Sequence, residues 1–194
     1  MPDFPQPTTG HFNVNPLSSI VLPHAETHAP GGNDPITQSV RFISTTDTTA
    51  LYNVTSSYAT VTGATTTFIS RGGRLRIVFS GPRGVRIDGD ANNLFGTLYI
   101  RAVIDSTNLS QYPMHINVQP TVVGTLLKLV RLYESGALIW YTAVASGKHT
   151  VTIQAYYTTG AGTVSATVAT DPENGAIHIP CTLSVEEILP VRAE

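Results

Sequence analysis

Two histidines are the residues of this chain whose type and spacing could do chemistry. His24 and His28 lie four positions apart in the segment LPHAETHAPGGNDPI, which also holds carboxylates. Imidazole and carboxylate groups bind transition metals, and a three-fold axis would supply each ligand three times. His24 and His28 are therefore a candidate metal site. Alternatively, because Pro23 and Pro30 leave room for only about one helical turn, both histidines cap turns or bond to carbonyl groups.

Two further patterns carry polar or charged groups. The run Asp88–Asn93 begins like a calcium loop, but it lacks Gly at the sixth position, and Tyr99 stands at the twelfth position, where an acidic residue is needed. We interpret it as a polar hairpin tip. Five arginines also cluster in the sequence, as either a patch for acidic partners or glycans or a solvated sheet face. They are Arg71, Arg74, Arg76, Arg83 and Arg86.

Known catalytic signatures do not occur in the sequence. It contains no Gly-x-Ser-x-Gly elbow, no Walker loop and no His-Glu-x-x-His motif. The Ser, His and Asp residues have no spacing that selects a catalytic triad. We therefore expect a protein that is not an enzyme and that uses no cofactor.

The composition is that of a globular protein with few charges. Of the 194 residues, 41% are hydrophobic and 12% are charged, and the net charge is −2. This balance gives no reason to expect nucleic acid or an anionic membrane as a partner. The N-terminus does not resemble a signal peptide, and no run approaches about 18 apolar residues. The single cysteine, Cys181, lies in an apolar run and is predicted to be buried.

Residues 1–38 are predicted to form an extended attachment arm that ends in a Pro- and Gly-rich turn. Prolines remove amide donors and favour extended backbone. A purely solvated linker would not need apolar side chains, so we hypothesise that those of the arm dock into a partner surface. The alternative is a tail without a partner. The anchoring residues are Phe4, Phe12, Val14, Leu17, Ile20, Val21 and Leu22.

The turn at the end of the arm carries a recognisable motif. The run Pro30–Pro35 is dense in Gly, Asn, Asp and Pro, which predicts a sharp change of direction. The segment resembles the His-x-x-Thr-His-x-x-Gly-Gly-x-Asp-Pro signature of bacteriophage virion proteins, found near the start of tail-fibre and other surface-displayed proteins. The matching residues are His24, Thr27, His28, Gly31, Gly32, Asp34 and Pro35.

Residues 39–194 have the pattern of a head domain built from strands. Thr, Val and aromatic residues recur in short segments at a spacing of about 8–12 residues, without a convincing helix. Leu75, Ile77 and Phe79 alternate with residues of the opposite face, which predicts one buried face. Breaks between strands are expected at Arg71–Gly73, Gly81–Gly84, Asp105–Tyr112, Ser135–Gly136 and Ser146–Gly147.

The last third of the chain resembles the final strands of phage and tumour-necrosis-factor-like jelly rolls. The matching segments are Gly147–Val151 (GKHTV) and Leu183–Glu187 (LSVEE). The resemblance implies one jelly-roll-like antiparallel β-sandwich, and such heads are commonly trimers. A second buried face between protomers would be rich in aromatic residues, unless these belong to an ordinary monomer core. The candidates are Tyr99, Val103, Trp140, Tyr156 and Tyr157.

The motif and the arm-plus-head organisation together imply a bacteriophage virion structural protein. Such a protein is assembled in the cytoplasm of a bacterial host and located in the virion. We favour a capsid decoration protein that stabilises the virion head, with the major capsid protein as the partner of the arm. The alternative is a short tail-fibre or receptor-binding protein that recognises a host surface glycan through distal loops. The loop candidates are Asn92, Asn93, Asp105 and Tyr112.

Overall fold

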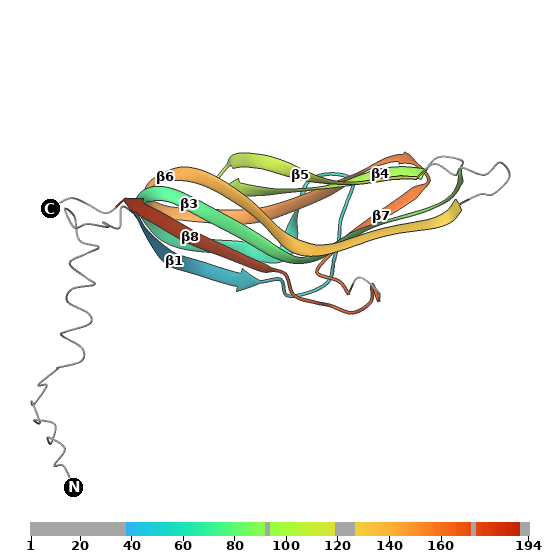
Figure 1. Ribbon diagram of the computed structural model, residues 1–194. Helices are drawn as coiled ribbons and strands as arrows, with labels where there is room; N and C mark the ends of the chain where they lie inside the picture. The colour runs from blue at the N-terminus through green and yellow to red at the C-terminus, as the bar shows by residue number, and fades with distance from the viewer. Residues whose placement is uncertain (1–37, 92–93, 119–126, 172–173, 191–194) are drawn as a thin grey trace, which may run out of the picture. The chain divides into compact units, whose positions relative to one another are not determined.

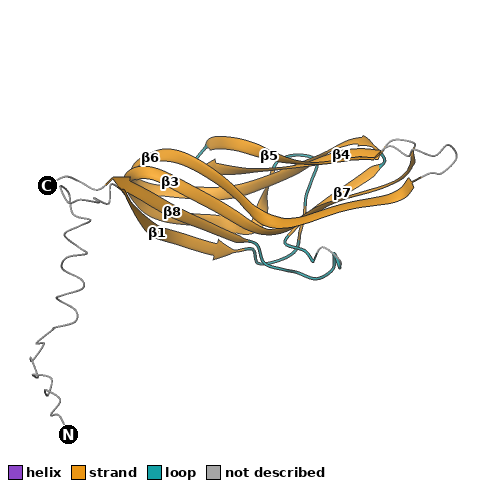
Figure 2. Ribbon diagram, in the orientation of Figure 1, coloured by secondary structure: helices purple, strands orange, loops and turns teal. Residues whose placement is uncertain are grey.

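The computed structural model describes residues 38–91, 94–118, 127–171 and 174–190 (Figure 1). By its internal contacts the chain separates into two units, Val40–Leu189 and Met1–Ser39 with Pro190–Glu194. The described residues fold as strands, turns and loops, so the predicted all-β class is confirmed (Figure 2). Among them there is no helix with the length and apolar character needed to cross a membrane.

Eight strands in the described part of the chain form one sheet. The order across the sheet is β1-β8-β3-β6-β4-β5, and β7 pairs with both β2 and β3. The pairs that β3 makes with β6, β7 and β8 are antiparallel, as are the pairs that β4 makes with β5 and β6. The bounds are β1 (Gln38–Asp47), β2 (Tyr52–Asn53), β3 (Ala59–Ala91), β4 (Leu94–Ile104), β5 (Thr107–Val118), β6 (Leu127–Ala161), β7 (Thr163–Val168) and β8 (Thr182–Pro190).

Two long strands, β3 and β6, hold the sheet together. They pair in one continuous register from Thr65↔Thr152 to Asp88↔Leu129. The C-terminal half of β6 also pairs with β4, whereas the C-terminal half of β3 also pairs with β8 and β7. Each half of the β3–β6 ribbon therefore has different neighbours, and Figure 1 shows the ribbon curving along the length of the sheet.

Four of the predicted breaks between strands are wrong, because β3 and β6 continue as strands through these positions. The breaks lie opposite one another in the β3–β6 ladder, where Gly81 pairs with Gly136 and Ser70 pairs with Gly147. Glycines at these points allow both strands to bend together, so the chain does not reverse. The predicted loop at Asp105–Tyr112 is also too long, since β5 already begins at Thr107.

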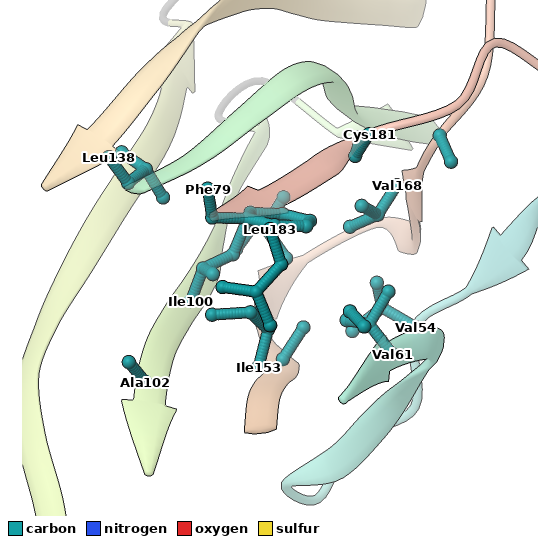
Figure 3. Packing of buried hydrophobic residues seen from close by; sticks show 14 of the residues in the cluster. Val54, Val61, Phe79, Ile100, Ala102, Leu138, Ile153, Val168, Cys181 and Leu183 are labelled. Carbon is teal, nitrogen blue, oxygen red and sulfur yellow. The ribbon is translucent and has the colours of Figure 1, made fainter. Parts of the chain in front are cut away.

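The sheet encloses a continuous hydrophobic core. As predicted, the alternating side chains of Leu75, Ile77 and Phe79 are buried, each at most 1% exposed. In Figure 3, Phe79 of β3 and Leu183 of β8 lie close to Ile100 of β4 and Ile153 of β6. The buried faces of the two halves of the ribbon therefore pack against each other. The jelly-roll topology and the trimer remain predictions.

Cys181 lies in this core, as the sequence predicted. It is 1% exposed, and its amide nitrogen donates a hydrogen bond to Thr48 Oγ1 over 2.8 Å. Burial raises the pKa of the Cys181 thiol to about 11.

Because the thiolate is the reactive form of cysteine, we expect no labelling of Cys181 in the native protein by a thiol reagent at pH 8 and stoichiometric labelling after unfolding in guanidinium chloride. Rapid labelling of the native protein would contradict the assigned burial.

Candidate functional site

The residues predicted to anchor the arm, and those of the His-x-x-Thr-His motif, lie outside the described residues. The candidate metal ligands His24 and His28 are among them, so the metal site stays a prediction. Within the described ranges, no three His, Cys, Asp or Glu side chains are grouped so that they could hold a metal ion.

The arginines between positions 71 and 86 do not form one patch. Arg83 is buried at 8% exposure and forms an ion pair with Glu134, whose Oε1 lies 2.5 Å from Arg83 Nη2. Arg76 of β3 pairs instead with Glu186, its partner on the neighbouring strand β8, over 3.0 Å. Their guanidinium groups therefore serve separate local contacts, which favours the structural interpretation for these two.

A depression of about 300 Å³ lies where β3, β6 and β7 meet. Tyr133 lies directly opposite Gly84 in the ladder, and its ring occupies the space that a side chain at position 84 would need. Arg86, which lies in the same depression, already has an interaction within the chain, and we assign no ligand here. The lining residues are Arg86, Tyr133, Ser165, Thr167, Gly175 and Ala176.

A buried carboxylate connects β1 to the core. Glu187 of β8 is fully buried, and its Oε2 lies 2.8 Å from Arg41 Nη2. Its Oε1 accepts hydrogen bonds from the Ser70 hydroxyl and, over 2.9 Å, from the Arg71 amide. Burial alone would raise the pKa of Glu187, but the Ser70 hydroxyl, the Arg71 amide and the Arg41 guanidinium together hold it below its usual value. We call Arg41, Ser70, Arg71 and Glu187 the Glu187 cluster.

The other end of β1 is also bound to β8 and the residue before it. The Thr48 amide donates to the Cys181 carbonyl over 2.8 Å, and the Cys181 amide donates back to Thr48 Oγ1. The Thr182 hydroxyl donates to Asp47 Oδ1 over 2.5 Å. Because β1 follows directly on residues 1–37, the strand that continues from the predicted arm is bound to the head at both of its ends.

His149 and Asp105 form a surface pair at the turn between β4 and β5. Asp105 has a φ of 53°, which is unusual for a residue with a side chain. His149 Nδ1 lies 2.9 Å from Asp105 Oδ2, and its Nε2 lies 3.0 Å from the Ala145 carbonyl oxygen. Since both ring nitrogens face acceptors, both must donate, which requires the protonated imidazolium. The hydrogen bonds to Asp105 and then to Ala145 raise the pKa of His149.

We expect Asp105→Asn to lower the pKa of His149 toward its ordinary value of about 6.5. The hydrogen bond from His149, followed by that from the Thr150 amide, lowers the pKa of Asp105. Because the His149 pKa is raised, His149 stabilises the fold below about pH 6.5, and this stabilisation is lost as pH rises through the folded pKa. Because the Asp105 pKa is lowered, Asp105 stabilises the fold above about pH 3.9, and this stabilisation is lost as pH falls through its folded pKa. NMR titration of His149 measures the shift, with Glu134→Gln as a remote control. An unchanged His149 pKa in Asp105→Asn would contradict the pairing.

Three tyrosines form a row on the outer face of β6 and β4. The Tyr99 and Tyr156 rings stack with centroids 4.7 Å apart and planes 12° apart, and the Tyr58 ring lies 4.2 Å from that of Tyr156. His115 of β5 adds an edge-on contact to Tyr99 at 6.3 Å. These rings are partly exposed or exposed, whereas the alternate residues, such as Ile100, point into the core. We call Tyr58, Tyr99 and Tyr156 the tyrosine row.

A second row of planar polar side chains lies beside the tyrosines. Arg101 of β4 stands directly between Gln154 of β6 and Gln111 of β5 in the sheet register. Its Nε and Nη2 donate to Gln154 Oε1 over 3.1 and 2.8 Å, and its guanidinium carbon lies 3.6 Å from the centre of the Tyr58 ring. The Tyr58 hydroxyl donates to Gln111 Oε1 over 2.5 Å. We call Gln154, Arg101 and Gln111 the Arg101 row.

Burial of a second face between protomers stays a prediction, but the structure shows on which side of the sheet its candidate residues lie. Of the five residues predicted for a second buried face, Tyr99, Val103 and Tyr156 lie on the outer side of the sheet. Tyr157 instead packs, partly buried, against the core. Trp140 is 2% exposed in the core, and its Nε1 donates to the Ser110 carbonyl over 2.6 Å. Its indole is therefore needed inside the monomer.

Two of the residues predicted to bind a ligand through distal loops, Tyr112 and Asp105, use their polar groups within the protein. The Tyr112 hydroxyl donates to the Ile139 carbonyl over 2.5 Å, and Asp105 is bound by His149 and the Thr150 amide. Asn92 and Asn93 lie outside the described residues. The Arg101 row was missed, because Gln154 lies 53 positions from Arg101 in the sequence. Arg101 and Gln154 each alternate with buried residues of their strands, which could have indicated outward-facing side chains. Only the register between the strands shows that these two side chains and that of Gln111 form one row.

Comparisons with known proteins identify no family for this chain. No protein-family model matches it, and no curated protein matches it. A solved structure of infectious bursal disease virus, Gx strain, is 11% identical with a TM-score of 0.26, over 77% of this chain and 37% of that chain. A structure of the Gt strain is 16% identical with a TM-score of 0.19, over 78% of this chain and 36% of that chain. This chain thus spans little more than a third of either protein, and at such TM-scores the likeness supports no conclusion.

Proposed function

We propose that this chain is a bacteriophage virion structural protein, and more specifically a capsid decoration protein. Its N-terminal arm binds the major capsid protein, and its β head is displayed on the virion surface, with three copies forming a trimer. The role is mechanical and needs no catalytic group. The resemblance of residues 24–35 to the virion motif supports the class of protein.

The way in which β1 is held supports the mechanical role. A load on the arm passes first into β1, and Arg41 of that strand is paired to the buried Glu187 of β8. At the other end of β1, reciprocal bonds join Thr48 and Cys181. Pulling along the strand would have to break these contacts together with the backbone bonds between β1 and β8. A first strand held in this way suits a head that bears load through an attachment arm.

Binding to capsids that lack the protein tests the anchoring arm. We expect the full chain to sediment with such capsids, and a variant with serine at the seven apolar arm positions to bind at least about 100-fold more weakly, since each buried apolar side chain contributes about 1.5–3 kcal/mol. The matched control carries serine at the exposed head positions Val40 and Phe42, 65% and 59% exposed. Both variants should unfold at the wild-type temperature. Equal binding by the arm variant and the wild type would refute the anchoring role.

A second candidate function is favoured by the outer face of β4, β5 and β6. Partly exposed tyrosines beside an arginine and two amides are suited to ligand binding, which fits a tail-fibre or receptor-binding protein better than a purely structural clamp. In that case the protein remains a virion component, and the face contacts a host surface glycan.

A further inference from the structure

We propose that the tyrosine row and the Arg101 row together bind an acidic oligosaccharide, with the guanidinium of Arg101 contacting a sugar carboxylate. The inference deepens the receptor-binding form of the proposed function and relies on it only for the biological setting. The binding itself is a property of the head and can be measured without virions.

Arg101 provides a positive charge that is held in place but not neutralised. Among the described residues it forms no ion pair, and it contacts the Gln154 amide oxygen and the Tyr58 ring. By contrast, Arg41, Arg76 and Arg83 each pair with a carboxylate. A fixed guanidinium without a counter-charge is a complement to an oxyanion. Gln154 occupies the edge formed by Nε and Nη2, so Nη1 and the second hydrogen of Nη2 remain to donate to a carboxylate.

The two glutamines of the Arg101 row use their amide oxygens within the protein. Gln154 Oε1 accepts from Arg101 and Gln111 Oε1 accepts from Tyr58, so both amide oxygens are used within the protein. The remaining group on each side chain is its NH₂, which can only donate. The Arg101 row therefore presents donors on either side of a cation. Such a set binds an anion and the hydroxyl or carbonyl oxygens attached to it.

The size and character of the face indicate a saccharide. Adjacent strands lie about 4.8 Å apart, so the Arg101 row across β6, β4 and β5 spans about 10 Å, the length of a disaccharide. The tyrosine row beside it offers ring edges and hydroxyl groups, which can contact the C–H groups and the hydroxyls of a pyranose. Stacking holds these rings before a ligand arrives, which lowers the entropy cost of binding.

Isothermal titration calorimetry on the full chain tests the proposal. The probes are trigalacturonate, which carries a carboxylate on each pyranose, a neutral galactose trisaccharide, and inorganic phosphate. We expect trigalacturonate to bind, with little heat from the other two, and Arg101→Gln to weaken binding about 10- to 100-fold, the range of a lost charge-assisted hydrogen bond. Gln111→Glu, which adds a like charge beside the carboxylate, should weaken it similarly, and Arg101→Lys should weaken it less than Arg101→Gln.

Arg74→Gln is the matched control. Arg74 also lies over a tyrosine ring, with its guanidinium carbon 4.8 Å from the centre of the Tyr141 ring, but its Cα partners across the sheet, Ala143 and Ile188, offer no amide donors. The control should bind trigalacturonate like the wild type. Equal losses in Arg74→Gln and Arg101→Gln would indicate general electrostatic attraction and overturn the site. No binding of trigalacturonate, phosphate binding as tight as that of the saccharide, or unchanged affinity in a folded Arg101→Gln would also overturn it.

Discussion

Replacement of Glu187 by alanine is expected to lower the free energy of unfolding by about 3–5 kcal/mol. The change removes a fully buried carboxylate from the Ser70 hydroxyl, the Arg71 amide and the Arg41 guanidinium. Removing Glu187 is costly mainly because the buried Ser70 hydroxyl loses its acceptor without regaining water, whereas Arg41, whose side chain is 34% exposed, is partly resolvated. Glu187→Gln keeps the shape and part of the hydrogen bonding, so its loss should be smaller.

The adjacent residue provides the control. Glu186 is 22% exposed and pairs with the 38% exposed Arg76 over 3.0 Å. A partly solvated pair of this kind contributes about 0–1 kcal/mol, so Glu186→Ala should lower the free energy of unfolding far less than Glu187→Ala. Urea unfolding followed by circular dichroism measures both. Equal losses in the two variants would show that Glu187 is not the buried partner described above.

The effect of Glu187 should also depend on pH. Its pKa is lower in the folded protein than in the unfolded chain, so the unfolded state binds the proton more readily. The stabilisation is therefore fully present above the unfolded pKa of about 4.3 and is lost as pH falls through the folded pKa. The difference in stability between the wild type and Glu187→Gln should shrink below about pH 4. A difference that grows on acidification would contradict the direction of the shift.

Replacement of Gly81 by alanine is expected to lower the free energy of unfolding by about 3 kcal/mol or more. Gly81 has a φ of 143°, which side-chain-bearing residues rarely adopt, and this strain costs about 1–3 kcal/mol. A Cβ there would also lie 2.8 Å from the Cα of Cys181 and overlap its sulfur. Overpacking against backbone atoms costs about 1–3 kcal/mol more.

Two glycines of β6 separate the cost of backbone strain from the cost of overpacking. Gly147 has a φ of 145° but open space around its Cβ position, and Gly136 has open space and no positive φ. Gly147→Ala should therefore lose only the strain term, about 1–2 kcal/mol, and Gly136→Ala should stay within about 0.5 kcal/mol of the wild type. Thermal unfolding of the three variants gives the series. If Gly81→Ala proved as mild as Gly136→Ala, the close contact of Gly81 with Cys181 would be wrong.

The sequence predicted the parts of this fold that depend on local pattern. The period of two at Leu75, Ile77 and Phe79 identified a buried face because alternation alone decides which side faces the core. The apolar surroundings of Cys181 likewise predicted its burial. Both are statements about neighbours in the chain, and both are confirmed.

Features that depend on long-range pairing could not be predicted in this way. Gly81 looks like the end of a strand until it is known to pair with Gly136, at which point the two glycines become a shared bend. The Arg101 row likewise needs the register that places Gln111 and Gln154 on either side of Arg101. The burial of Glu187 has no local signal either, because its partner Arg41 lies 146 positions away in the sequence.

Immunogold labelling of intact virions with an antibody raised against residues 39–194 tests the central claim most directly. We predict gold particles over the virion head, as expected for a capsid decoration protein whose β head is displayed. Gold confined to the tail tip would contradict decoration and favour the receptor-binding alternative, making the acidic saccharide the ligand to pursue. If purified virions bound no gold and contained none of this protein, a virion role would be contradicted altogether.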